Sequence, residues 1–338
     1  MASVDNVPGF VDGAATRRIV VASFALGLLT ATQASAATLG PGTVIMSVAP
    51  PAAANDQVSV MTAPLQFVTV DGATLGYRTA GTGLPLVIIG GSSFTMAEWD
   101  PQLLNTLVAK RRVIIFDNRG VGTSTGAVDA LTIAQMAHDT ARLIDKVAGG
   151  KADVLGWSMG GYIAQELAIA YPDSIRRLVL ASTDCGGPDT LGPTARALRI
   201  LTDPQATQAE RLSILFPRNR TGAAIAWSAA IGETFAANGY QPHDSFTVSP
   251  ATAAAQVQAS GPLWLGEGHG TCTRLGRITH RTLIASGVND VVVPSINRHA
   301  LADGIRWSDV QVYRHAGHAF LFQPGLDFAR TVLDFLTS

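Results

Sequence analysis

Short apolar runs alternate with longer amphipathic stretches from residue 66 to the C-terminus. Continuous or alternating apolar residues predict strands, and apolar residues that recur about every 3.6 positions predict helices. The predicted strands cover 66–70, 73–78, 86–89, 112–117, 153–156, 178–182, 282–286 and 310–313, and the predicted helices lie around 133–144, 160–171, 297–301 and 326–336. Because strands and helices alternate, we expect an α/β fold with a mostly parallel central sheet and helices on both faces.

The alternation stops after residue 186 and resumes near residue 276. The stretch between these points is rich in Ala, Gly, Thr and Pro, and it contains helical pieces but no clear buried strand. We interpret it as a mainly helical cap inserted between two strands of the sheet. The predicted organisation is a flexible linker over 37–64, a first core segment over 65–185, the cap over 186–275 and a second core segment over 276–338.

The N-terminal residues 1–36 have the features of an export signal. An arginine pair at 17–18 precedes an apolar stretch over 19–30, and Ala-Ser-Ala at 34–36 offers a cleavage site. The arginine pair also fits the twin-arginine route in part. We therefore expect the protein to be exported to the periplasm or secreted. The alternative is translation that begins at Met61, which would leave the protein in the cytoplasm.

Composition narrows the classes of function. Hydrophobic residues make up 47% and charged residues 14% of the 338 positions, so a buried core is expected. The 24 Lys and Arg balance 25 Asp and Glu, and no basic stripe of the kind that nucleic-acid binding needs is present. There is no C-x-x-C or H-E-x-x-H motif, so no dedicated zinc site is expected. Because no apolar run reaches the ~18–20 residues that span a bilayer, we expect no stable membrane insertion of the mature chain.

A serine lies at the junction between a predicted strand and a predicted helix. The stretch Gly156 to Gly160 reads Gly-Trp-Ser-Met-Gly and fits the G-x-S-x-G motif of a nucleophile elbow, with Ser158 as the candidate nucleophile. At the start of the helix, the backbone N–H of Met159 is placed to stabilise an oxyanion. A simpler interpretation is that Ser158 only caps the helix.

Candidate partners of the serine follow it in the order acid, then histidine. Asp290 comes after the strand at 282–286, and His318 comes after the strand at 310–313. Both would lie at the carboxyl edge of the sheet, where His318 would accept the proton of Ser158 and Asp290 would orient the histidine.

Two other residues compete for these roles. Asp184 follows the strand at 178–182, which is where some proteins of this architecture carry the acid, but it could equally form a turn. His315 lies three positions before His318, nearer the strand end and without a preceding glycine. We favour Asp290 and His318 on their placement in the predicted loops.

Five stretches together resemble a known family. They are IIGGSSFTMAEWDP, VIIFDNRGVGTS, DVLGWSMGGYIAQELA, GVNDVVVP and HAGHAFLF, and they occur in the order found in bacterial members of the α/β-hydrolase fold-1 family. The resemblance extends from about residue 66 to the C-terminus, apart from the cap. It implies esterase-like or related hydrolytic chemistry without a metal or a cofactor, with Ser158, Asp290 and His318 in the roles given above.

The same resemblance implies a second oxyanion donor after the third strand. Family members often carry His-Gly-x there, and the equivalent here is Gly90-Gly91-Ser92. We place this donor at the backbone N–H of Ser92, or of Ser93 if the loop is shifted by one position. The stretch Asp117-Asn118-Arg119-Gly120 matches the turn that follows the fourth strand in this family, and we interpret Arg119 in it as a structural residue.

Large side chains near the motifs predict an apolar pocket and an uncharged acyl or ring substrate. The residues concerned are Phe94, Met96, Trp99, Trp157, Met159, Trp227, Trp264 and Phe320. The leading hypothesis is hydrolysis of a small to medium, largely apolar ester. The alternatives are perhydrolase (haloperoxidase-like) or carbon–carbon bond hydrolase activity, and a non-catalytic ligand-binding protein on the same fold. Epoxide hydrolases and haloalkane dehalogenases resemble this fold but carry an aspartate at the elbow, so they are disfavoured.

The two cysteines lie close to the two ends of the predicted cap. Cys185 and Cys272 could form a disulfide across the base of the cap, or remain as two unpaired thiols. The pattern of the chain does not indicate an oligomeric state, and a small-molecule substrate is the only partner that we expect.

Overall fold

A computed structural model describes the chain from residue 59 onward. The described ranges are 59–203, 205–217, 221–237, 248–266, 269–323 and 327–338. The predicted export signal and residues 37–58 of the predicted linker lie outside them. Within the described ranges, no helix is long and apolar enough to cross a membrane.

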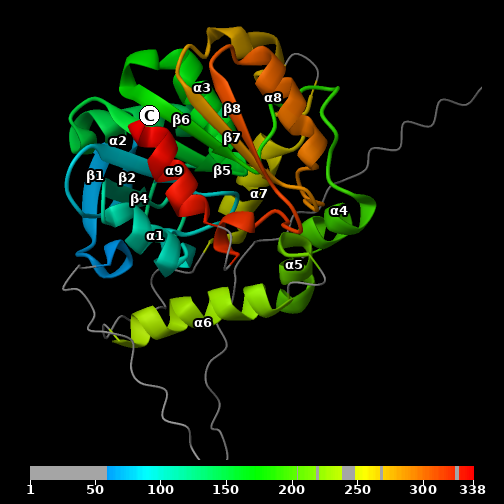
Figure 1. The fold of residues 1–338 in the computed structure, drawn as a ribbon, viewed down its shortest axis with the longest axis horizontal. Coiled ribbons are helices and arrows are strands. Elements are labelled where there is room, and N and C mark those ends of the chain that lie inside the picture. Colours follow the sequence, from blue (N-terminus) through cyan, green and yellow to red (C-terminus); the bar gives the residue numbers. More distant parts are fainter. Residues whose placement is uncertain (1–58, 204, 218–220, 238–247, 267–268, 324–326) are drawn as a thin grey trace, which may run out of the picture.

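Eight strands form a single sheet in the order β1-β2-β4-β3-β5-β6-β7-β8 (Figure 1). Their bounds are β1 (Gln66–Val70), β2 (Ala73–Ala80), β3 (Pro85–Ile89), β4 (Arg112–Phe116), β5 (Ala152–Trp157), β6 (Ile175–Ala181), β7 (Thr282–Gly287) and β8 (Ser308–Tyr313). The β1–β2 and β2–β4 pairs are antiparallel and all other pairs are parallel. The predicted α/β fold class is therefore confirmed.

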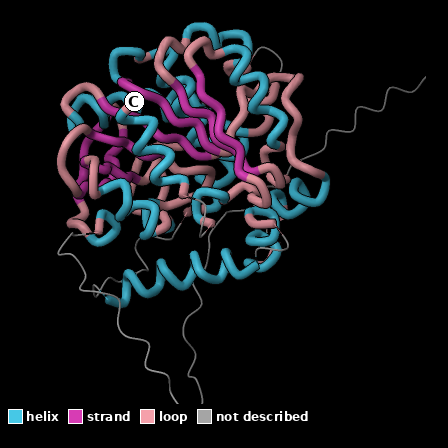
Figure 2. Tube along the Cα trace, in the orientation of Figure 1, coloured by secondary structure: helices cyan, strands magenta, loops and turns pink. Residues whose placement is uncertain are grey.

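The central strands are apolar without interruption because both faces of the sheet are covered. In β3, Ile88 belongs to one apolar cluster, whereas Val87 and Ile89 belong to the other. The first cluster includes side chains of α1 (Pro101–Val108) and α9 (Phe328–Thr337). The second includes side chains of α2 (Ile133–Ala148), α3 (Met159–Ala170) and α8 (Arg298–Gly304). Figure 2 shows these helices around the strands.

Helix α1 was not among the predicted elements, although its start carries a clear local signal. Asp100 caps the helix, because its carboxylate accepts the N–H of Leu103 at 2.8 Å, and Pro101 occupies the first helical position. The helix is only 8 residues long, which leaves too few turns for its apolar period to stand out in the sequence.

The inserted stretch is mainly helical, as predicted. It contains α4 (Ala195–Thr202), α5 (Gln208–Leu215), α6 (Thr221–Ala237) and α7 (Pro250–Ser260). A disulfide joins Cys185 to Cys272 across 87 positions of the sequence, so the first of the two open alternatives is the observed one. In the chain-entropy description, a loop of this length stabilises the fold by about 4–5 kcal/mol.

The predicted linker ends too late. Residues Val60–Thr62 form a 3-10 helix, and Val60 and Met61 are 0% and 1% exposed within the core. The backbone carbonyl of Ala63 also accepts a hydrogen bond from Arg78 on β2. The packed domain therefore includes residues before Gln66, and a chain that began at Met61 would lack the buried side chain of Val60.

Arg119 has the structural role that its turn predicted. Its guanidinium donates two hydrogen bonds to Asp139 on α2, at 2.8 Å from Nε and 2.6 Å from Nη2. It also donates to the carbonyls of Asp71 and Gly72 in the β1–β2 turn. This buried ion pair joins the loop after β4 to two neighbouring elements.

Candidate active site

Ser158 occupies a sharp turn between β5 and α3. Its backbone has φ 57° and ψ −125°, a conformation that non-glycine residues rarely adopt. A Cβ on Gly160 would lie 2.2 Å from the carbonyl oxygen of Ile89, and one on Gly156 would lie 2.2 Å from the carbonyl oxygen of Gly160. The two glycines of the motif are therefore required by the close approach of helix and strand.

Three side chains that are distant in the sequence form one continuous hydrogen-bonded chain. His318 Nε2 lies 3.0 Å from Ser158 Oγ, and His318 Nδ1 lies 2.8 Å from Asp290 Oδ2. The other carboxylate oxygen of Asp290 accepts the N–H groups of Val292 at 2.9 Å and Val293 at 2.8 Å. His318 and Asp290 are 3% and 6% exposed, so this arrangement is largely shielded from water.

The loop that carries His318 is held by backbone contacts that the sequence did not reveal. The indole N–H of Trp157, beside the serine, donates to the carbonyl of His318 at 3.1 Å. Asn289, next to the acid, donates its backbone N–H to the carbonyl of Ala316 at 2.8 Å. These bonds fix the histidine loop relative to both the serine turn and the acid loop.

Asp184 makes no hydrogen bond to His318, and its carboxylate accepts hydrogen bonds from three other groups. It accepts the hydroxyl of Tyr162 at 2.9 Å, the N–H of Gly186 at 2.8 Å and the indole N–H of Trp264 at 3.1 Å. Burial raises the pKa of Asp184 above its usual value, although these three donors oppose the shift. Its position joins α3 to the base of the cap.

His315 is also separate from the site. Its side chain is exposed and its backbone has φ 57°. Only its carbonyl, which accepts from Gln323 at 3.2 Å, makes a hydrogen bond within the described residues.

The loop after β3 runs directly beside Ser158. A Cβ on Gly91 would lie 3.3 Å from the Cβ of Ser158. The N–H of Ser93 donates to Gln256 Oε1 of α7 at 2.6 Å, so this donor is already occupied. For the N–H of Ser92 there is no acceptor among the described residues. Of the two donors left open by the sequence, Ser92 is thus the one available to a ligand.

A cavity of about 210 Å³ opens at Ser158. It is lined by Ser92, Ser158, Met159 and His318, and we call it the Ser158 cavity. Apolar side chains from the core and the cap make up most of its remaining surface: Phe94, Trp157, Leu198, Leu215, Trp227, Val257, Leu265 and Val293. No Lys or Arg is among the described residues that line it, whereas the carboxyl groups of Glu98 and Asp184 are.

Four of the large side chains expected to flank the chemistry do not line this cavity. Trp99 and Phe320 are 0% exposed, Met96 is 1% and Trp264 is 3%. They pack in the core instead. Closeness to a motif along the sequence does not determine the direction in which a side chain points. Conversely, the sequence prediction missed Glu98, which the Thr-x-x-Glu capping pattern at 95–98 could have pointed out.

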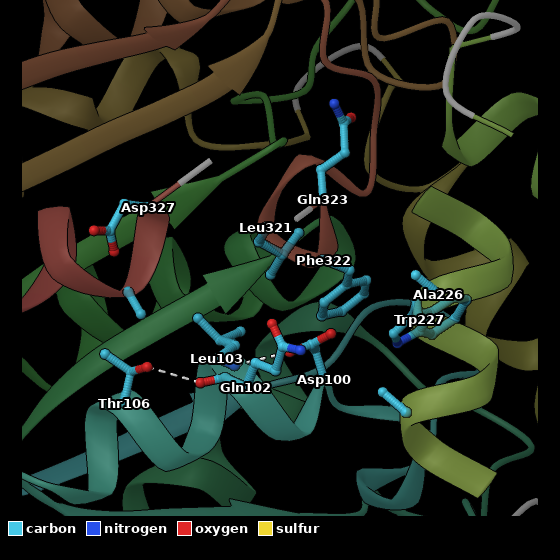
Figure 3. Close-up of a pocket in the computed structure, with 12 residues that line it drawn as sticks. Asp100, Gln102, Leu103, Thr106, Ala226, Trp227, Leu321, Phe322, Gln323 and Asp327 are labelled. Atoms are coloured by element: carbon cyan, nitrogen blue, oxygen red, sulfur yellow. Dashed lines mark hydrogen bonds between the residues drawn. The ribbon is translucent and has the colours of Figure 1, made fainter. Parts of the chain in front are cut away.

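A second cavity of about 310 Å³ lies between α1, α6 and the segment that leads into α9 (Figure 3). Asp100 and Gln102 of α1, Trp227 of α6 and Asp327 of the C-terminal segment line it. It shares only Trp227 with the Ser158 cavity, and Ser158 and His318 do not reach it. No group of three or more His, Cys, Asp and Glu suited to a metal ion occurs in the described part of the chain.

The fold and this arrangement match those of a known family. The sequence profile of the α/β-hydrolase fold family matches residues 85–324, and the chain therefore belongs to that family. Its membership, together with its hydrolase relatives, identifies the protein as an enzyme of the hydrolase class.

Individual relatives cover most of the chain. RutD of Variovorax paradoxus, a protein named for carbamate hydrolysis, is 31% identical over 73% of this chain and 88% of its own length. The 2-hydroxymuconate semialdehyde hydrolase of a Pseudomonas species is 30% identical over 77% of this chain and 91% of its own. An α/β-hydrolase fold protein from Chitinophaga pinensis superimposes with a TM-score of 0.71 at 26% identity, over 83% of this chain and 100% of that one.

Proposed function

We propose that the protein is a serine hydrolase that cleaves small to medium, largely apolar carboxylic esters through an acyl-enzyme on Ser158. The observation that carries this proposal is the unbroken chain of hydrogen bonds from Ser158 through His318 to Asp290. A serine hydroxyl is a weak nucleophile until a neighbouring base removes its proton, and His318 Nε2 is within reach of that proton.

The proposed reaction has two halves. Ser158 Oγ attacks the ester carbonyl while His318 takes its proton, and the leaving alcohol receives that proton as the carbon–oxygen bond breaks. Water then attacks the acyl-enzyme, with His318 as base, and releases the carboxylic acid and the free serine. Asp290 keeps the imidazole in the required tautomer, and the N–H groups of Met159 and Ser92 stabilise the oxyanion of each tetrahedral intermediate.

The lining of the Ser158 cavity supports an uncharged substrate. Its surface is mostly apolar, and the ionisable side chains on it, apart from His318, are the acid Glu98, the acid Asp184 and the phenol Tyr162. An anionic substrate would meet no cation among the described lining residues, so its loss of hydration would not be compensated.

A second candidate is hydrolysis of a carbon–carbon bond next to a carbonyl group. The relative named as a 2-hydroxymuconate semialdehyde hydrolase favours it, since the same serine, histidine and acid can serve both reactions. We rank it below ester hydrolysis because a muconate derivative carries a carboxylate, for which the described lining residues offer no Lys or Arg.

A labelling experiment tests the proposal. A fluorophosphonate probe is expected to attach to the wild-type protein and not to Ser158→Ala. Product analysis with aryl esters, with a vinylogous diketone and with peroxide plus a carboxylic acid then separates ester hydrolysis, carbon–carbon cleavage and perhydrolysis. A wild-type protein that resists the probe would remove the basis for a serine nucleophile.

We also propose that the chain is exported by means of residues 1–36. Burial of Val60 supports a start upstream of Met61, because that side chain fills part of the core. N-terminal sequencing of the native protein is expected to find an N-terminus after Ala36. An N-terminus at Met61 or Thr62 would contradict export.

A further inference from the structure

Glu98 is a buried carboxyl group on the surface of the Ser158 cavity that the proposed triad does not use. It ends the short helix Met96–Glu98 in the loop after β3, and it is 3% exposed. Its Oε2 accepts the backbone N–H of Thr95 at 2.7 Å and the Thr95 hydroxyl at 3.1 Å. Its Oε1 has no hydrogen-bond partner among the described residues.

The capping role of Glu98 accounts for one oxygen only. In a capping box the glutamate accepts the backbone N–H of the N-cap residue, which needs only one carboxylate oxygen. Here Oε1 is not among the fully enclosed polar atoms without a partner, so it is accessible from the mostly apolar Ser158 cavity that Glu98 lines. The geometry therefore leaves one polar atom whose partner must come from the contents of the cavity.

The surroundings of Glu98 favour its neutral form. No Lys, Arg or His within the described residues forms an ion pair with it. Burial raises the pKa of Glu98 to about 8, and the nearby Asp117 adds to this effect. Because Oε2 already accepts two hydrogen bonds, the proton belongs on Oε1, which then becomes an O–H donor.

The position of this donor is fixed from both sides. On the core side, Asp117 at the end of β4 accepts the N–H of Met96 at 2.7 Å and so holds the same loop. On the cap side, the indole N–H of Trp227 donates to the backbone carbonyl of Glu98 at 3.2 Å. The Trp227 ring stacks on Phe322 at 5.1 Å between centroids, and Figure 3 shows these two side chains between α6 and the C-terminal segment.

We propose that Glu98 is a specificity-determining residue that donates a hydrogen bond from Oε1 to a neutral oxygen of the substrate, such as a ketone or ether oxygen, away from the scissile carbonyl. The inference rests on the proposed function in that the Ser158 cavity is the substrate site. It narrows the substrate class from apolar esters in general to esters that carry a second, uncharged oxygen acceptor.

Matched substrates test this directly. Each member of a series of aryl oxo- and oxa-alkanoates, with the additional oxygen at successive chain positions, is compared with the alkanoate of the same length. The measured quantity is the ratio of kcat/KM within each pair. We expect the wild type to prefer one oxygen-bearing ester by about 10-fold at neutral pH, the magnitude of one buried hydrogen bond.

Two variants separate the donor from the capping role. Glu98→Gln keeps an oxygen for Thr95 and offers an amide N–H₂ to the substrate, so it is expected to retain the preference. Glu98→Leu has no donor. Its ratio of kcat/KM within a pair is expected to be the one found when neither ester accepts a hydrogen bond from residue 98. Glu166→Gln changes a carboxyl group that pairs with Arg274 outside the cavity, and it serves as the matched control with the wild-type ratio.

The pH dependence of the same ratio provides a readout that a purely structural role would not change. Above about pH 8 the wild-type carboxyl ionises, loses its donor and is expected to lose its preference, whereas Glu98→Gln keeps it. Other ionisable groups face this region: Asp117 and Asp100 from the core side, and His318, Asp184 and Tyr162 across the cavity. The Glu98→Gln variant keeps all of these groups, so a pH dependence of the ratio that is present in wild type and absent in Glu98→Gln belongs to Glu98.

The outcomes distinguish this inference from the proposed function. A wild-type ratio that favours no oxygen-bearing ester, or a preference that Glu98→Leu retains, overturns the role of Glu98 even if Ser158 is labelled by the fluorophosphonate. If Glu98→Leu does not fold, an equal loss of preference above pH 8 in wild type and Glu98→Gln overturns it. If Ser158 is not labelled, the role of Glu98 is tested by calorimetric binding of the matched pairs to Ser158→Ala and to Ser158→Ala/Glu98→Leu. The proposal requires that the oxygen-bearing ligand binds more tightly than its partner to the first variant and loses this advantage in the second.

Discussion

The two sides of the Ser158 cavity are built in different ways. On the sheet side, Ser158, Asp290 and His318 lie in loops after β5, β7 and β8. The backbone N–H of Asn289 joins the acid loop to the histidine loop, and the indole N–H of Trp157 joins the histidine loop to the serine turn. On the cap side, apolar side chains of α4 to α7 make up most of the cavity wall. The cap bonds to the core through side chains such as Trp227 and Gln256, and also through backbone groups such as the carbonyl of Leu215, which accepts the N–H of Ala319 at 2.9 Å. The sheet side carries the polar groups of the proposed chemistry, whereas the cap side supplies mostly apolar walls that shape the substrate site.

The largest effect is expected on the sheet side. Asp290→Asn removes the carboxylate that orients His318, and kcat is expected to fall about 10³- to 10⁴-fold. Asp184→Asn is the matched control, since its bonds go to Tyr162, Gly186 and Trp264, and its kcat is expected to fall by much less. Steady-state kinetics with one aryl ester checks both variants. A greater loss of kcat in Asp184→Asn than in Asp290→Asn would assign the role of the orienting acid to Asp184.

The next largest effect is expected for the disulfide at the base of the cap. Replacement of Cys185 and Cys272 by Ser opens a loop of 87 positions, and the free energy of unfolding is expected to fall by about 4–5 kcal/mol in the chain-entropy description. Chemical denaturation of the double variant against wild type measures it. An unchanged midpoint and slope would show that the cap is held by its packing alone.

Stability is also expected to depend on pH through Glu98. Its pKa is about 8 in the folded protein against 4.5 for the ordinary side chain, so the folded state binds more protons between these values. The contribution of Glu98 to stability is therefore present at low pH and is lost as the pH rises toward 8 and beyond. Asp117 and Asp184 are shifted in the same direction, and a comparison with Glu98→Gln removes their effect.

Denaturation across this pH range gives the measurement. The stability of wild type relative to Glu98→Gln is expected to decrease steadily as the pH is raised from below 4.5 to above 8. A difference that stays constant with pH would mean that Glu98 titrates normally.

The smallest effect is expected where the cap meets the loop after β3, which carries the proposed oxyanion donor Ser92. Gln256→Ala removes the acceptor of the Ser93 N–H, leaving a buried donor unsatisfied next to Ser92. A loss of about 1–2 kcal/mol, or roughly 10-fold in kcat/KM, is expected from the loosened loop. Thr252→Ala, which removes another hydrogen bond from α7 to the core, is the control for a general loosening of the helix. Equal losses in both variants would show that α7 acts only as packing.

The same difference explains what the sequence could predict. The parallel strands and the residues of the proposed triad follow local rules, because a continuous apolar run predicts a buried strand and the loop after it reaches the carboxyl edge. Ser158, Asp290 and His318 were found by their positions in those loops, and the structure brings all three together.

Features that depend on packing between distant segments were not predictable. Trp99 packs against the ring of Phe322, which is distant in the sequence, and Phe320 packs against other aromatic rings of the core. The bond from Gln256 to Ser93 depends on how the cap sits on the core, and the sequence left the pairing of Cys185 with Cys272 open. Glu98 stands between these cases, since its capping pattern is local but its backbone carbonyl accepts the indole N–H of Trp227 in the cap.

The central claim is that Ser158 is activated by His318 and that its reaction intermediate is held by Met159 and Ser92. A crystal structure of the protein treated with a fluorophosphonate tests it most directly. We expect phosphorus bonded to Ser158 Oγ, with one phosphoryl oxygen about 2.7–3.1 Å from the backbone nitrogens of both Met159 and Ser92. An adduct on another side chain, or an oxygen directed away from these two nitrogens, would contradict the account.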